Sequence, residues 1–406
     1  MPASSIRKAI CACLLLTFGM VSTNAVTNTA GGAAVVNYGD ANAAHFWRQL
    51  AALEHGYGEE VRIVQLGDSH TGGDYFTQTL REHLQQRFGY AGIGWLTPGF
   101  VKNQRSAQVL MRMSGQWKTR VSHGEPDNFP LGGVVNQAGP GAAIEIVPKA
   151  PLNGLLRVSI WTRRKGEEAA GGWTLTFPDG EVRELPPAFG SDWQVSYVIG
   201  NGNDVNSLLL RASGNPPELG AITVDAIAPG VTVDALGIVG ATQKVITNWQ
   251  PEAVREQLGW RRPDLVILSY GTNEAFDIRF DVEGYRADLR RTIRELRDAA
   301  PDAAILLIGA PDAGKKTGRG VRVGCRYDLP DALRAVQEAQ RQVAREERLL
   351  YWDWAAAMGG ACAMQEYAES KPPLGRPDLI HFTEEGYARS GMSFYDALME
   401  SYARGR

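Results

Sequence analysis

The sequence lacks a long hydrophobic run, a surplus of positive charge and more than a few cysteines. Its 406 residues hold 42 Lys and Arg against 45 Asp and Glu, so it has no excess of cations to neutralise a nucleic-acid backbone, and nucleic acid is not expected as a partner. Four cysteines in this length exclude a disulfide-dense miniprotein. The composition, 44% hydrophobic and 21% charged, is typical of a globular protein with about two to three domains.

The apolar run Ala9 to Val21 has only 13 residues, which is short for a membrane span. Basic residues precede this run, and the small-residue sequence Thr23-Asn24-Ala25 follows it, as in a secretory signal. We therefore expect residues 1–25 to be removed on export to the periplasm or cell envelope, leaving a mature chain with no integral membrane segment.

Two cysteines, Cys325 and Cys362, remain after removal of the expected signal. An oxidising compartment favours a disulfide between them, and two unpaired thiols are the alternative.

The pattern of apolar residues changes twice along the chain. After a linker over 26–44, short buried strands alternate with amphipathic helices over 45–104 and again over 232–406. Over 105–231 helical periodicity disappears, and short alternating runs predict an antiparallel sandwich or jelly roll. We therefore expect a doubly wound α/β domain, flavodoxin-like with three layers around a parallel sheet, interrupted by an all-β insert.

Polar residues follow several of the predicted strands, and in an open parallel sheet the working groups lie at the carboxyl ends of strands. In Gly67-Asp68-Ser69-His70, Ser69 can present its hydroxyl and its amide to one site beside a helix N-terminus. In the turn after the strand 231–237, a glycine lets a backbone N–H approach a substrate closely. Gly237 and Gly240 both lie in this turn.

Two further blocks complete the set. Asn273, after the apolar run 265–268, can donate a side-chain N–H to a developing oxyanion. Asp378 and His381 lie three residues apart, so the carboxylate can accept from Nδ1 and leave Nε2 as a base. Each of these is a common turn residue by itself, but their order predicts a nucleophile at Ser69, oxyanion donors in the two following turns, and a base oriented by a carboxylate. No cofactor or metal is expected, because the His and Cys residues show no zinc-ligand spacing.

These four ordered blocks resemble the SGNH, or GDSL-type, hydrolase superfamily over residues 60–104 and 232–402. The resemblance implies a serine esterase with Ser69, Asp378 and His381 as its catalytic residues. It implies oxyanion donors at Ser69, Gly240 and Asn273, with Gly237 as the alternative to Gly240. The sequence has His70 where the commoner form of the superfamily has Leu.

Two sequence runs, 67–74 and 88–95, and the position of the β insert narrow the resemblance to the bacterial peptidoglycan O-acetylesterase branch. In that branch the insert resembles a carbohydrate-binding module, and the reaction removes acetyl groups from the 6-hydroxyl of N-acetylmuramic acid. An O-acetylated glycan is therefore the expected partner.

The sequence is also compatible with other functions. An O-acetyltransferase would pass the acetyl group of the same acetyl-enzyme to a glycan hydroxyl, and no motif separates the two reactions. A non-catalytic glycan-binding protein on this fold would be expected to lose Ser69 or His381, and both are present. A general lipase would need an apolar lid, of which the sequence gives no sign.

Three tryptophans of the insert are candidates for sugar-stacking platforms. Trp173 and Trp193 alternate with apolar residues on one strand face, which predicts that both are buried. Trp161 shares its face with Arg157 and Ser159, so it is the expected exposed glycan contact.

Overall fold

The fold is described from a computed structural model, which places residues 33–123, 128–164, 171–186, 188–203, 206–316 and 324–405. The expected signal, residues 1–25, and the first residues of the expected linker lie outside this described part. None of the described helices is long and apolar enough to cross a membrane.

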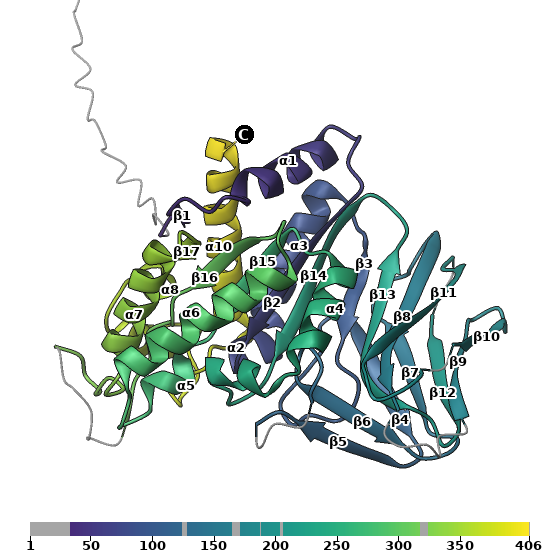
Figure 1. The fold of residues 1–406 in the computed structure, drawn as a ribbon. Helices are drawn as coiled ribbons and strands as arrows, with labels where there is room; N and C mark the ends of the chain where they lie inside the picture. Colours follow the sequence, from purple (N-terminus) through teal and green to yellow (C-terminus); the bar gives the residue numbers. More distant parts are fainter. Residues whose placement is uncertain are drawn as a thin grey trace, which may run out of the picture. The chain divides into compact units, whose positions relative to one another are not determined.

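The α/β part is built on a six-stranded sheet with the order β1-β17-β16-β15-β2-β14 (Figure 1). Five strands run parallel, as predicted. β1 pairs antiparallel with β17, so the sheet is mixed and the prediction of a wholly parallel sheet is wrong at this edge. The strands are β1 Val36–Asn37, β2 Glu60–Gly67, β14 Gly230–Gly237, β15 Leu265–Ser269, β16 Ala304–Ile308 and β17 Leu350–Trp352.

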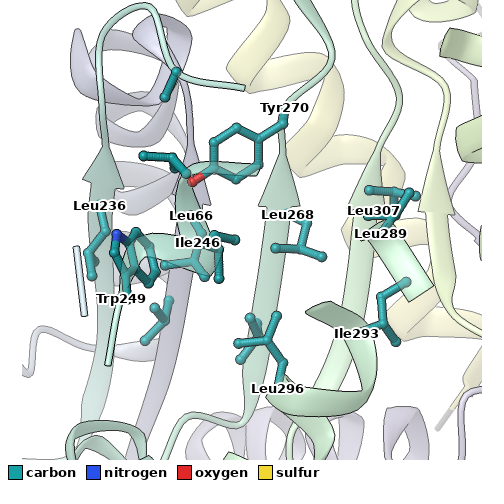
Figure 2. Packing of buried hydrophobic residues seen from close by; sticks show 14 of the residues in the cluster. Leu66, Leu236, Ile246, Trp249, Leu268, Tyr270, Leu289, Ile293, Leu296 and Leu307 are labelled. Carbon is teal, nitrogen blue, oxygen red and sulfur yellow. The ribbon is translucent and has the colours of Figure 1, made fainter. Parts of the chain in front are cut away.

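Helices cover both faces of this sheet, because alternate strand residues point to opposite sides. Val64 and Val266 belong to one core, which includes α4, α6 and α7, whereas Ile63 and Leu265 belong to the other, with α1, α3 and α10. The helices are α1 Ala43–Glu54, α2 Ser69–Gly72, α3 Tyr75–Phe88, η1 Gln243–Asn248, α4 Pro251–Arg261, α5 Thr272–Ala275, α6 Val282–Ala299, α7 Leu333–Glu346, α8 Trp354–Met358, α9 Ala363–Glu369 and α10 Glu384–Gly405. Figure 2 shows the first core, where leucines of the strands face η1 and α6.

The β part consists of two antiparallel sheets with a common core. One has the order β10-β9-β12-β7-β4, and the other β11-β8-β13-β6-β5 with β3 also paired to β13. Ile144 and Leu210 of the first sheet share a buried cluster with Val158 and Val224 of the second. The strands are β3 Gly92–Leu96, β4 Val109–Ser114, β5 Trp117–Val121, β6 Val134–Ala138, β7 Ala143–Pro148, β8 Leu155–Arg163, β9 Gly171–Thr176, β10 Val182–Leu185, β11 Gln194–Asn201, β12 Leu208–Gly214 and β13 Glu218–Ala226.

The three tryptophans that the sequence offers as sugar platforms are buried. Trp173 and Trp193 are 2% and 1% exposed, which confirms the prediction that they are core residues. Trp161 is 0% exposed, so the prediction that it offers a surface platform for a sugar is wrong. The reason is that the second face of β8 is covered too: Trp161 packs edge-on against Trp260 of α4, with ring centroids 6.5 Å apart. A strand covered on both faces does not sort its residues into buried and exposed.

A buried ion cluster joins the β part to the α/β part. Arg261 of α4 donates to Asp225 of β13 at 2.8 Å and to Asp234 of β14 at 2.7 and 2.9 Å. All three side chains are at most 1% exposed. Burial opposes the charge of Arg261, but the carboxylates outweigh it and raise the pKa of the guanidinium. A Cβ at Gly94 would lie 2.3 Å from Asp234 Oδ1, so the glycine run before Trp95 shapes this junction.

Candidate active site

Ser69 is the first residue of the short helix α2, directly after β2. Asp68 caps this helix, its Oδ1 accepting from the His70 N–H at 2.9 Å. A Cβ at Gly67 would lie 2.1 Å from Thr71 Oγ1, so only glycine allows the turn to close this tightly. The turn leaves the Ser69 side chain partly exposed at the carboxyl edge of the sheet.

Ser69, His381 and Asp378 lie in one hydrogen-bonded row. Ser69 Oγ is 3.0 Å from His381 Nε2, and His381 Nδ1 is 2.9 Å from Asp378 Oδ2. The other carboxylate oxygen of Asp378 accepts from the N–H groups of Ile380 and His381, each at 2.9 Å. Partial burial opposes ionisation of Asp378, but these hydrogen bonds lower the pKa of the carboxyl below its ordinary value. The structure thus brings Ser69 next to a His–Asp pair that lies about 310 positions later in the sequence.

The two glycines of the turn after β14 have different surroundings. A Cβ at Gly237 would lie 2.0 Å from Gly72 N, so Gly237 is needed for close packing against α2. Gly240 is exposed, with a φ of +79°, and the nearest atom to a Cβ there is His123 Cε1 at 3.9 Å. Within the described residues, the Gly240 N–H donates to no backbone carbonyl. Of the two, Gly240 therefore has the N–H that a substrate oxygen can reach.

Asn273 holds the same turn. Its Nδ2 donates to the carbonyl of Ala241 at 2.8 Å, which ties the turn after β14 to the turn after β15. A side-chain amide carries two donor hydrogens, so a second N–H remains for a ligand.

Buried ionisable side chains lie beneath Ser69, a region called the floor here: Asp68, His70 and Glu274. Burial raises the pKa of Asp68 to about 6 and that of Glu274 to about 7, and it lowers the pKa of His70 to about 3. His70 Nδ1 lies 2.9 Å from the Tyr387 hydroxyl. The His70 ring centroid is 5.5 Å from that of His381. Sequence reasoning missed this floor, although His70 in place of the common Leu was its visible signal.

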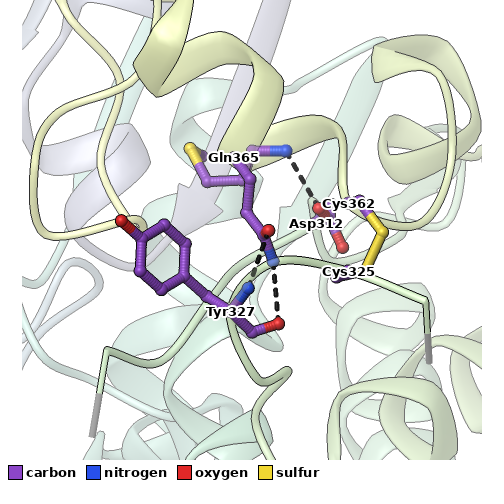
Figure 3. Close-up of a disulfide and its surroundings, with 6 residues drawn as sticks. Asp312, Cys325, Tyr327, Cys362 and Gln365 are labelled. Atoms are coloured by element: carbon purple, nitrogen blue, oxygen red, sulfur yellow. Dashed lines mark hydrogen bonds between the residues drawn. A yellow bond between two sulfur atoms is a disulfide. The ribbon is translucent and has the colours of Figure 1, made fainter. Parts of the chain in front are cut away.

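A disulfide supports the segment that carries Asp378 and His381. Cys325 is bonded to Cys362, which immediately precedes α9 (Figure 3). From the last turn of that helix, the Tyr367 carbonyl accepts from the N–H groups of Leu374 and Gly375, where the Asp378 segment begins. The bond, one of the two alternatives left by the sequence, therefore anchors a helix that holds one side of the site.

A hydroxyl, an imidazole and a carboxylate are hydrogen-bonded in a row at the carboxyl edge of the sheet, beside groups with shifted pKa values. This arrangement is characteristic of an acyl hydrolase site. Residues 169–389 match the model of the GDSL-like lipase/acylhydrolase family, and residues 91–201 match that of the peptidoglycan O-acetylesterase N-terminal region. The chain belongs to the GDSL-like lipase/acylhydrolase family and is an esterase, which confirms the resemblance.

One solved structure agrees with this family. A structure described as a peptidoglycan O-acetylesterase in action is 35% identical, with 91% of this chain and 99% of that chain covered and a TM-score of 0.78. This match supports the SGNH hydrolase fold. A Bacillus subtilis protein is 12% identical, with 70% of this chain and 88% of that chain covered. Its TM-score of 0.34 is too low to show a shared fold. No curated protein matches.

Proposed function

We propose that this esterase removes O-acetyl groups from peptidoglycan, at the 6-hydroxyl of N-acetylmuramic acid. The observation that carries the proposal is the row of two short hydrogen bonds from Ser69 through His381 to Asp378. It occurs in a chain that is 35% identical, over 91% of its length, to a structure described as a peptidoglycan O-acetylesterase.

The proposed reaction has two steps. Ser69 Oγ bonds to the acetyl carbonyl carbon while its proton passes to His381 Nε2, and the oxyanion accepts from the N–H groups of Ser69, Gly240 and Asn273. The bond between that carbon and the sugar oxygen then breaks, and the sugar oxygen takes the proton from His381. Water next attacks the acetyl-serine with His381 as base, releasing acetate and restoring the serine hydroxyl. Asp378 stays ionised and holds the His381 tautomer.

The organisation of the chain is part of the same proposal. Residues 1–25 would direct export to the periplasm or cell envelope, where peptidoglycan lies. Residues 26–44 would link them to the enzyme and would also supply the edge strand β1. The hydrolase domain would comprise 45–104 and 232–406, interrupted over 105–231 by a jelly roll of the carbohydrate-binding-module type. The two antiparallel sheets with a common core support a separate β part, to which β3 of the first hydrolase segment is also paired.

The test is acetate release from O-acetylated peptidoglycan by the mature protein. We expect release by the wild type and by Ser114→Ala, a matched change at an exposed serine, and only the uncatalysed rate with Ser69→Ala. De-O-acetylated wall is the blank. If Ser69→Ala releases acetate as the wild type does, the serine mechanism is wrong. If the wild type hydrolyses a small aryl acetate but not the wall, the substrate is wrong, and transfer to an added glycan acceptor is then measured.

A further inference from the structure

A cavity of about 420 Å³ lies between the α/β part and the β part, beside the turn that carries Ser69. One wall is the segment 97–106, which joins β3 to β4. Arg105 N donates to the carbonyl of Gly72 at 3.1 Å, and Gly72 is in the same short helix as Ser69. At the other end of the segment, Asn136 Nδ2 donates to the Pro98 carbonyl at 2.8 Å. The segment is therefore held against both parts of the chain.

The charge of this cavity is opposite to that of the protein. Its lining includes Arg81, Arg105 and Lys149 but only one carboxylate, Asp74, in a chain whose net charge is −3. Arg81 and Asp74 are bound to each other at 3.0 Å. Within the described residues, neither Arg105 nor Lys149 has a carboxylate partner, so an anion would find two cations available there.

Arg105 is already oriented. Its guanidinium carbon lies 3.8 Å from the centroid of the Tyr75 ring, and its Nη1 lies 3.4 Å from the Gly73 carbonyl. Lys149 Nζ lies 3.4 Å from the Ser106 carbonyl on the same wall. Two cations oriented by backbone contacts lose little freedom when a carboxylate binds.

The rest of the lining suits a peptide. Phe100, 83% exposed, and the half-exposed Leu110 offer apolar surface at the rim. Gln104 Oε1 is buried without a hydrogen-bond partner in the described part of the chain, so it is an acceptor ready for an N–H group. A neutral sugar would use the aromatic ring and the amide but leave the excess positive charge unmatched. A peptide with free carboxylates would use all three features.

We propose that this cavity binds the acidic peptide stem attached to the sugar strand whose acetyl group is removed. The proposal rests on the proposed function for its substrate, since the stem and the acetyl group are carried by the same sugar. It assigns to the junction between the two parts of the chain a role in selecting stem-bearing wall over bare glycan.

The first test measures binding, which requires no turnover. De-O-acetylated glycan fragments with their peptide stems, and the same fragments stripped of stems by an amidase, are titrated into the full-length protein by calorimetry. We expect removal of the stems to raise the Kd roughly tenfold, because charged hydrogen bonds are lost. Amidation of the stem carboxylates should weaken binding similarly.

Variants of cavity residues test whether the stem-dependent difference in Kd arises in this cavity. Phe100→Ala and Lys149→Gln, both at exposed side chains, should reduce the tenfold difference to about threefold or less, whereas Lys118→Gln, an exposed lysine outside the cavity, should preserve it. Equal binding of stem-bearing and stem-free fragments by the wild type would overturn the proposal. So would variants that keep the full difference. Failure to release acetate from wall would refute the proposed function instead, and the binding result would still decide whether the cavity takes the stem.

Discussion

Two clusters of buried ionisable groups differ in how their charges are balanced: the junction cluster of Arg261, Asp225 and Asp234, and the floor beneath Ser69. At the junction, the Arg261 guanidinium lies between two carboxylates and Arg157 also contacts Asp225, so two cations compensate the two carboxylates. In the floor, the carboxyls of Asp68 and Glu274 have raised pKa values of about 6 and 7, with burial as the main cause.

The difference separates two uses of buried charge. A compensated cluster has a fixed protonation state. Removing one of its members destabilises the fold, because the remaining charges are then buried without a partner. An uncompensated cluster titrates near neutral pH and depends on its surroundings for its protonation state, which is the usual condition of groups beside reacting atoms. The junction should therefore respond to loss of a side chain, and the floor to a change of pH.

Removing Arg261 from the junction cluster should lower the free energy of unfolding more than any other change considered. Arg261→Met leaves Asp234 buried without its counter-charge and Asp225 with only the partly exposed Arg157, and we expect the free energy of unfolding to fall by about 3–5 kcal/mol in urea titrations. Arg157→Met is the matched control. Arg157 also contacts Asp225, at 3.3 Å, but it is 28% exposed, so its loss should cost no more than about 1 kcal/mol. Equal losses in the two variants would contradict the distinction between a compensated buried charge and a peripheral one.

Glu274→Gln tests the floor. The folded protein releases the Glu274 proton near pH 7 and the unfolded chain near 4.5, so the folded state binds more protons between these values. Stability from this group is complete below pH 4.5 and is lost as the pH rises through 7, by up to about 3 kcal/mol. Gln keeps an oxygen that can accept from Gln243 N, at 2.7 Å in the wild type, but cannot ionise.

The variant should therefore gain on the wild type as the pH rises from about 4.5 to about 8, in urea unfolding at each pH. Glu283→Gln, at an exposed glutamate of α6, should follow the wild-type curve. A constant difference between Glu274→Gln and the wild type would mean that Glu274 is ionised throughout.

Sequence patterns predicted the three-layer α/β fold and the order of Ser69, Gly240, Asn273 and His381, because strand ends and turns leave local signals. They missed β1, because a two-residue edge strand has no periodicity. They misjudged Trp161, because which element covers a strand's second face depends on distant contacts. They could not find the floor for the same reason: burial, which shifts these pKa values, is a property of the assembled fold.

His70 offers the finest test, because its response to pH has the opposite sign to that of Glu274. Burial lowers the pKa of His70 from 6.5 to about 3, so below pH 6.5 the unfolded chain binds a proton that the folded protein does not. Its share of stability is present above pH 6.5 and falls as the pH drops, by about 1 kcal/mol between pH 6.5 and about 5.5.

His70→Gln should remove the loss of stability that His70 causes as the pH falls. Between pH 6.5 and about 5.5, the free energy of unfolding of the variant should therefore rise by about 1 kcal/mol relative to the wild type. His55→Gln, at an exposed histidine, should show no such shift. Because the Asp68 and Glu274 carboxyls oppose His70 over the same pH range, wild-type stability can look flat there. The difference in unfolding free energy between His70→Gln and the wild type, measured at each pH, removes this cancellation. If the two curves are parallel, His70 does not contribute to the pH dependence of stability.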